Sequence, residues 1–114
     1  MEKSSSYLVE ITPEAEQYYL ELLSYLYQTH SSKSANKKSE YILDLAMSLD
    51  ENPNRGSREE DLEYLGKEHQ FLIYPITKRK TVKVIYFVKE DIKTVYVTDF
   101  FPTEMNPSKL KDRN

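Results

Sequence analysis

Residues 69–101 decide the fold, and they read HQFLIYPITKRKTVKVIYFVKEDIKTVYVTDFF. Three apolar runs rich in Val, Ile, Tyr and Phe lie in this stretch, at residues 70–77, 81–88 and 94–101. Short charged segments separate them, at residues 78–80 and 89–91. Apolar runs of this length with short polar breaks are typical of strands joined by tight turns. The stretch therefore predicts two successive hairpins, which together form an antiparallel meander.

Alternation along the predicted strands indicates which side chains share a face of the sheet. The middle strand alternates between one set, Val82, Val84, Tyr86 and Val88, and another, Lys83, Ile85 and Phe87. The last strand alternates in the same way between Val95, Val97 and Asp99 and the set Tyr96, Thr98 and Phe100. Pro75 lacks the N–H that a central strand donates, so it predicts an edge position or a bulge in the first strand.

The chain before the meander predicts one strand and two helices that cover the sheet. Residues 7–11 alternate as a short strand does. Thr12 is suited to cap a helix and Pro13 to its first position, so we expect a helix at residues 13–29. A second helix is expected at residues 34–49, and Pro53 and Gly56 end it. Only a few residues separate the two helices, which predicts an antiparallel helical hairpin.

Residues 57–65 lie between the second helix and the meander. Residues 57–61 are charged and predict a loop, whereas residues 62–65 are a weak candidate for a strand. The fold class is therefore α+β: an N-terminal strand, a helical hairpin, and then an antiparallel meander of three to four strands. We expect the helices to cover one face of the sheet and the other face to be open to a partner.

Composition bounds the class of protein. A chain of 114 residues is expected to form one domain over residues 1–114, with residues 1–6 and 103–114 flexible because they are polar. The absence of cysteine fits a reducing compartment. The first residues lack the apolar core of a signal peptide, and no apolar run is long enough to span a membrane. We therefore expect a cytoplasmic protein that does not enter the membrane.

The formal net charge of −3 argues against a protein that is basic all over, as many nucleic-acid binders are. The charge is uneven, however, because acidic side chains are concentrated before Lys67 and basic ones outnumber them after it. Two distant histidines and no cysteine give no metal-binding pattern. Two glycines, Gly56 and Gly66, give no phosphate-binding loop. We expect neither a metal nor a cofactor.

Four local patterns, in their order along residues 7–101, resemble the RelE/ParE family of toxins from bacterial type II toxin–antitoxin systems. The first is the N-terminal strand followed by Thr12-Pro13-Glu14-Ala15-Glu16. The second is the helix ending at residues 45–56, LAMSLDENPNRG, with its leucine, proline and glycine. The third is Tyr64-Leu65-Gly66 followed by residues 71–76, FLIYPI. The fourth is the apolar strand at residues 82–88, VKVIYFV.

The resemblance implies the toxin of a type II toxin–antitoxin module that serves plasmid stabilisation, with a cognate antitoxin as its partner. Many members resembling this chain are metal-independent endoribonucleases that cut mRNA on the ribosome, and this is the function we expect first. The ParE branch instead inhibits DNA gyrase without catalysis. A non-toxic interaction domain of the same fold is the third alternative. The sequence lacks the terminal His-Tyr or Arg-Tyr pair that is common in the nucleases.

The resemblance implies candidate site residues for RNA cleavage, in which a ribose 2′-hydroxyl attacks the adjacent phosphate. That step needs a proton acceptor, a cation for the developing negative charge and a donor to the leaving oxygen. His69 and Asp99 are the candidate catalytic residues, Asp99 because it falls where the resembling nucleases usually have their terminal catalytic residue. His69 could instead be a solvated histidine of a hairpin. The candidate substrate-binding residues are Lys67, Arg79, Lys83 and Phe101. The lysines and arginine could instead keep a sheet edge solvated, and Phe101 could be a core residue.

Overall fold

The computed structural model describes residues 6–113, in which helices and strands form an α+β fold. The order begins with β1 (Leu8–Ile11), α1 (Pro13–Thr29) and α2 (Ser32–Met47). The strands β2 (Ser57–Arg58), β3 (Gln70–Pro75), β4 (Thr81–Lys89) and β5 (Thr94–Pro102) follow, and α3 (Ser108–Asp112) comes last. Short 3-10 turns, labelled η1 (Ser48–Asp50), η2 (Pro53–Arg55), η3 (Glu60–Leu65) and η4 (Glu90–Ile92), connect them. No helix within this part of the chain is both long and apolar enough to cross a membrane.

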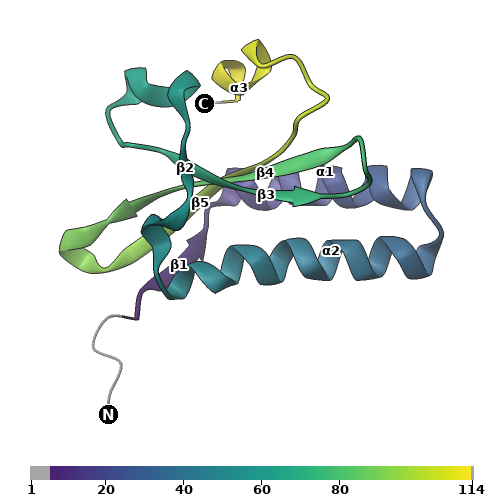
Figure 1. The fold of residues 1–114 in the computed structure, drawn as a ribbon, viewed down its shortest axis with the longest axis horizontal. Helices are drawn as coiled ribbons and strands as arrows, with labels where there is room; N and C mark the ends of the chain where they lie inside the picture. The colour runs from purple at the N-terminus through teal and green to yellow at the C-terminus, as the bar shows by residue number, and fades with distance from the viewer. Residues whose placement is uncertain (1–5, 114) are drawn as a thin grey trace.

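The described strands form one five-stranded sheet in the order β1-β5-β4-β3-β2 (Figure 1). Strands β2 to β5 are an antiparallel meander, and β1 joins it as a strand parallel to β5. The three strands predicted at residues 70–101 are therefore present. The sheet is mixed rather than antiparallel throughout, because the helical hairpin carries the chain from β1 across the sheet before the meander begins.

Local capping sets the two helices where the sequence predicts them. The Thr12 side chain accepts a hydrogen bond from the Ala15 N–H at 3.1 Å and so caps α1. The Ser31 side chain accepts from the Ser34 N–H at 3.1 Å and starts α2 two residues earlier than expected. Both helices lie on the same side of the sheet in Figure 1, on what we call its first face. Their buried residues pack there with the alternate side chains Val82, Val84, Tyr86, Val95 and Val97.

The second face of the sheet is not open along its whole length, contrary to expectation. The turn η3 and the helix α3 lie over part of it (Figure 1). Their leucines meet two sheet residues in a small core, which we call the Leu110 cluster and which contains Leu62, Ile85, Phe101 and Leu110. Each of these four side chains is at most 3% exposed. The rest of the second face is where a partner can reach the sheet.

Two segments therefore differ from the predicted elements. Residues 62–65 belong to η3 rather than to a strand, because Leu62 must turn down onto Ile85 while Gly66 ends the turn in the left-handed region at φ 72°. Residues 57–58, expected in a loop, pair with β3 instead. The C-terminal segment, expected to be flexible, contains α3 and the buried Leu110. The expectation for residues 1–6 lies outside the described residues except at Ser6.

A β-bulge reverses the alternation of β5 after Val97. Tyr86 pairs with Val97, but its neighbour Ile85 pairs with Asp99, so Thr98 is the extra residue. The predicted pattern placed Asp99 with Val95 and Val97; the bulge turns Asp99 to the second face. Phe100 then joins the core beneath the helices. The strict period of two therefore gave the wrong faces for the end of this strand.

Candidate nucleic-acid interface

A hollow of about 560 Å³ lies on the second face of the sheet beside the Leu110 cluster. It is bordered by the start of α1, by β4 and β5, by the loop after η3 and by the C-terminal end of the chain. Its lining consists of Thr12, Glu14, Lys67, Phe87, Lys89, Tyr96, Thr98 and Arg113. We call it the basic hollow because three of these side chains are cations and only one is an acid.

Two aromatic rings form the floor of the basic hollow. Phe87 on β4 and Tyr96 on β5 are register partners, and their ring centroids are 5.3 Å apart. Both are half-buried, so their sheet-bound side is packed while the other side faces the hollow. The Lys67 ammonium lies 5.1 Å from the Phe87 centroid. Proteins that bind single-stranded nucleic acids use such an arrangement, in which cations bind the phosphates and the accessible faces of aromatic rings stack on the bases.

Lys67 and Lys89 are exposed, and neither forms an ion pair with another residue between 6 and 113. The one acid in the lining is Glu14 at the start of α1, and Glu68, Glu90 and Asp91 border an adjoining hollow without an ion pair to either lysine. The two lysines are therefore available to an anionic ligand. Because they stand in water, their attraction for such a ligand depends on salt concentration.

The third cation, Arg113, is held in a fixed position by Asp99 and Tyr18. Its Nε and Nη2 donate to the two oxygens of Asp99 at 3.1 and 2.8 Å. Its guanidinium also stacks on Tyr18 of α1, 3.8 Å from the ring centroid. Asp99 is fully buried. Burial raises the pKa of its carboxyl group, and the hydrogen bonds and charge of Arg113 oppose that rise. Asp99 thus orients Arg113 and has no oxygen directed at open solvent.

His69 lies behind the floor of the hollow. Its ring meets Phe87 edge-on, with centroids 5.2 Å apart, and it is only 3% exposed. Its Nδ1 is buried without a hydrogen-bond partner among the described residues. Burial lowers the pKa of the imidazole, the charge of Lys67 lowers it further, and Glu59 acts in the opposite direction. His69 is therefore neutral at neutral pH, the form that accepts a proton.

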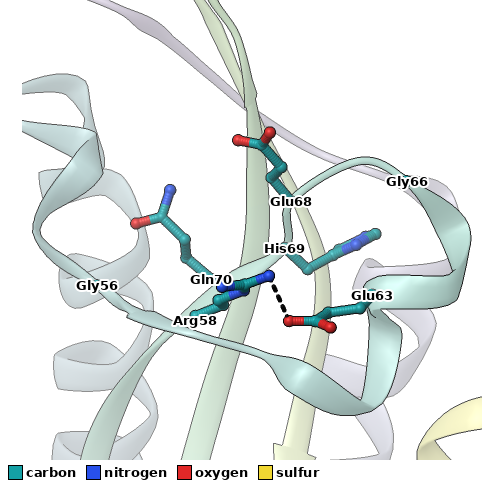
Figure 2. A pocket seen from close by; sticks show the side chains of 7 residues that line it. All are labelled: Gly56, Arg58, Glu63, Gly66, Glu68, His69 and Gln70. Carbon is teal, nitrogen blue, oxygen red and sulfur yellow. Dashed lines mark ion pairs between the residues drawn. The ribbon is translucent and has the colours of Figure 1, made fainter.

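A second cavity, of about 580 Å³, lies beside the loop that carries Gly66 and Glu68 (Figure 2). We call it the Gly66 pocket; it is lined by Gly56, Arg58, Glu63, Gly66, Glu68, His69 and Gln70. Figure 2 shows the Arg58 guanidinium and the Glu63 carboxylate in contact at the border of this pocket. The Arg58 Nη2 and the Glu63 Oε2 are 2.6 Å apart. His69 thus separates the Gly66 pocket from the basic hollow.

The remaining predicted binding residues lie outside both cavities. The Lys83 ammonium pairs with the buried Glu59 at 2.8 Å and lies 4.2 Å from the Phe71 centroid. Arg79 stands in the exposed turn between β3 and β4. Phe101 is buried in the Leu110 cluster, where no base could stack on it without displacing α3. Of the six predicted residues, the structure places Lys67 in the hollow and His69 and Asp99 directly behind its lining.

Sequence reasoning missed four residues of the hollow: Phe87, Lys89, Tyr96 and Arg113. Alternation on β4 does carry a signal for two of them, since Lys83, Ile85, Phe87 and Lys89 follow one another at a spacing of two. Tyr96 could be placed beside Phe87 only once the register between β4 and β5 was known. Arg113 carried no signal, because its position depends on a helix that one leucine anchors.

No group of acidic, histidine or cysteine side chains within residues 6–113 is arranged to hold a metal ion. Comparison of the sequence with models of known protein families gives no match. None of the curated proteins compared with the chain is similar to it either. The resemblance drawn from the local sequence patterns therefore stays a prediction.

Proposed function

We propose that this protein is the toxin of a type II toxin–antitoxin module and acts as a metal-independent endoribonuclease on mRNA at the ribosome. The basic hollow carries this proposal: two unpaired lysines and an oriented arginine surround two neighbouring aromatic rings on an accessible sheet face. The order of strand, helical hairpin and meander also supports it, since the resemblance in the sequence implies that order. A cognate antitoxin is the expected partner, and it would have to block the hollow.

The side chains of the hollow have distinct roles in the proposed reaction. Lys67 and Lys89 bind the phosphates of the strand, and Phe87 and Tyr96 stack on its bases. Arg113, oriented by Asp99, stabilises the charge that develops on the attacked phosphate. The attack of a ribose 2′-oxygen on the phosphorus forms a 2′,3′-cyclic phosphate and breaks the bond to the 5′-oxygen of the next nucleotide, which leaves with a proton taken from water. His69, neutral and located between the two cavities, is the proposed acceptor of the 2′-hydroxyl proton.

The test is induced expression in a bacterial host without any antitoxin, followed by pulse labelling of protein and DNA synthesis. Wild-type protein should halt protein synthesis while cleaved transcripts accumulate. The double variant Lys67→Ala/Lys89→Ala should lose this effect. The control is Lys33→Ala/Lys37→Ala, which removes the same charge from exposed positions on α2, far along the chain from the hollow. It should remain as toxic as the wild type.

Each alternative gives a different result in the same experiment. A halt in DNA synthesis while translation continues would assign the protein to the gyrase-inhibiting class. Continued growth with soluble, folded protein would leave a non-toxic interaction domain and overturn the proposal. His69→Gln separates the chemical step from binding, because it should reduce transcript cleavage while purified protein still binds RNA.

A further inference from the structure

We propose that the Gly66 pocket holds a guanine base of the RNA strand whose phosphates lie in the basic hollow; this inference rests on the proposed function. Both cavities border the same short loop. Lys67 lines the basic hollow, while its neighbours Gly66 and Glu68 line the Gly66 pocket. Gly66 and Glu68 both have left-handed backbone conformations, at φ 72° and 58°. The chain thus reverses on each side of Lys67, and a nucleotide can straddle the loop.

The charges of the two cavities determine which cavity holds the phosphate of the nucleotide and which holds its base. The Gly66 pocket has two carboxylates, Glu63 and Glu68, against one guanidinium, Arg58, so it disfavours a phosphate. The basic hollow has three cations and one carboxylate and favours it. The phosphate therefore belongs in the hollow and the uncharged base in the pocket. Its volume lies within the range that suits small ligands.

The paired side chains at the border of the pocket determine which base fits. The Arg58 Nη2 contacts the Glu63 Oε2, so N–H donors stand directly beside carboxylate acceptors. A guanidinium has five N–H groups, and most of those of Arg58 are left for a ligand. The pair thus presents one donor followed by two acceptors. The complementary edge of a base has one acceptor followed by two donors, which are the O6, N1–H and N2–H groups of guanine.

The other bases match this pattern less well. Adenine and cytosine each place a bare ring nitrogen, an acceptor, against the carboxylate of Glu63. Uracil has the central N–H but offers a second carbonyl oxygen where guanine has its amino group. Inosine keeps the O6 and N1–H of guanine and lacks only the amino group. Guanine should therefore bind best, inosine next, and adenine and cytosine least.

The experiment measures binding of short RNA strands to the full chain by fluorescence anisotropy. The probes are CCGCC, CCICC, CCACC and CCCCC with 2′-fluoro groups, which prevent attack by a 2′-hydroxyl. We expect CCGCC to bind about tenfold more tightly than CCACC, the effect of one good paired contact to a base edge, with CCICC between them. In Glu63→Gln, the preference for CCGCC over CCACC and the preference for CCICC over CCACC should both fall to less than twofold. Glu60→Gln, an exposed acid in the same turn η3, is the matched control and should keep them.

The outcomes separate this inference from the proposed function. Equal binding of all four strands, still lost in Lys67→Ala/Lys89→Ala, would overturn the guanine pocket and leave RNA binding intact. No binding of any strand would overturn RNA binding by the hollow as well. If free GMP bound as tightly as CCGCC, the pocket would be a site for a free guanine nucleotide, and its assignment to the strand would be wrong. Circular dichroism of each variant verifies that it is folded.

Discussion

The imidazole of His69 is packed against Phe87 with an unpartnered Nδ1, and this burial links its titration to the stability of the fold. Burial lowers its pKa in the folded protein below the value of about 6.5 for an unfolded histidine. Between the two values the unfolded chain binds more protons than the folded one. The free energy of unfolding therefore falls as the pH is lowered from about 6.5, by at most about 1.4 kcal/mol per pH unit for this one group.

The variant His69→Gln removes the pH-dependent contribution of this imidazole to the free energy of unfolding. The variant should be less stable at pH 8, because it loses the packing on Phe87, and the difference should narrow as the pH falls towards 5. Urea denaturation at a series of pH values measures this. His30→Gln, in the turn between the two helices, controls for the loss of a histidine. A difference that is the same at pH 8 and pH 5 would contradict the linkage.

Replacing Arg113 and replacing Asp99 should lower the free energy of unfolding by unequal amounts, although the two residues form one ion pair. Asp99 is fully buried on β5 and its short side chain cannot reach solvent, whereas the long side chain of the partly buried Arg113 can. Arg113→Ala leaves a carboxylate buried without its partner, and we expect a loss of about 3 kcal/mol in the free energy of unfolding. Asp99→Asn lets Arg113 turn outwards and should cost only about 1–2 kcal/mol. Equal losses, measured by urea denaturation at pH 7, would contradict this asymmetry.

At the scale of elements, the short helix α3 depends on one side chain. Leu110 is 1% exposed and packs in the Leu110 cluster, while the lysines on either side of it are exposed. A five-residue helix has little stability of its own, so packing must hold it. Leu110→Ala should lower the free energy of unfolding by about 2 kcal/mol, the low end for such a change, because the segment can detach. It should also release the helix locally.

Limited trypsin digestion measures this local release. Cleavage after Lys109 and Lys111 should be much faster in Leu110→Ala than in the wild type, under conditions where the rest of the chain stays intact. Ser108→Ala, at an exposed position of the same helix, should leave the cleavage rate unchanged. If both variants were cleaved at the wild-type rate, the docking of α3 through Leu110 would be refuted.

The same elements show how far the sequence predicts this structure. Strong periodic patterns predicted α1, α2 and the strands β3, β4 and β5, because each has several apolar residues at the right spacing. The bulge at Thr98 was beyond such reasoning, since it depends on how two distant strands align. The position of α3 was likewise hidden, because one leucine in a polar segment gives no period. The hollow depends on both features, so only part of its lining could be predicted.

At the scale of the whole molecule, the net charge of −3 conceals a local group of three cations in the basic hollow. Exposed acids such as Glu16, Glu40 and Asp44 stand on the helices of the first face. The basic hollow opens on the second face. RNA that approaches the basic hollow therefore meets cations, although the molecule as a whole carries a net negative charge.

Binding of a single strand releases counterions from each phosphate that the protein neutralises, and the logarithm of the binding constant falls with the logarithm of salt concentration by about 0.7 per contact. Three cations in the hollow predict a slope of about −2. Lys67→Ala/Lys89→Ala should bring the slope to about −0.7, because only Arg113 remains. Lys33→Ala/Lys37→Ala changes the net charge by the same amount on α2 and should keep the wild-type slope. If that control reduced the slope as much as the hollow variant, RNA would be responding to overall charge rather than to the basic hollow.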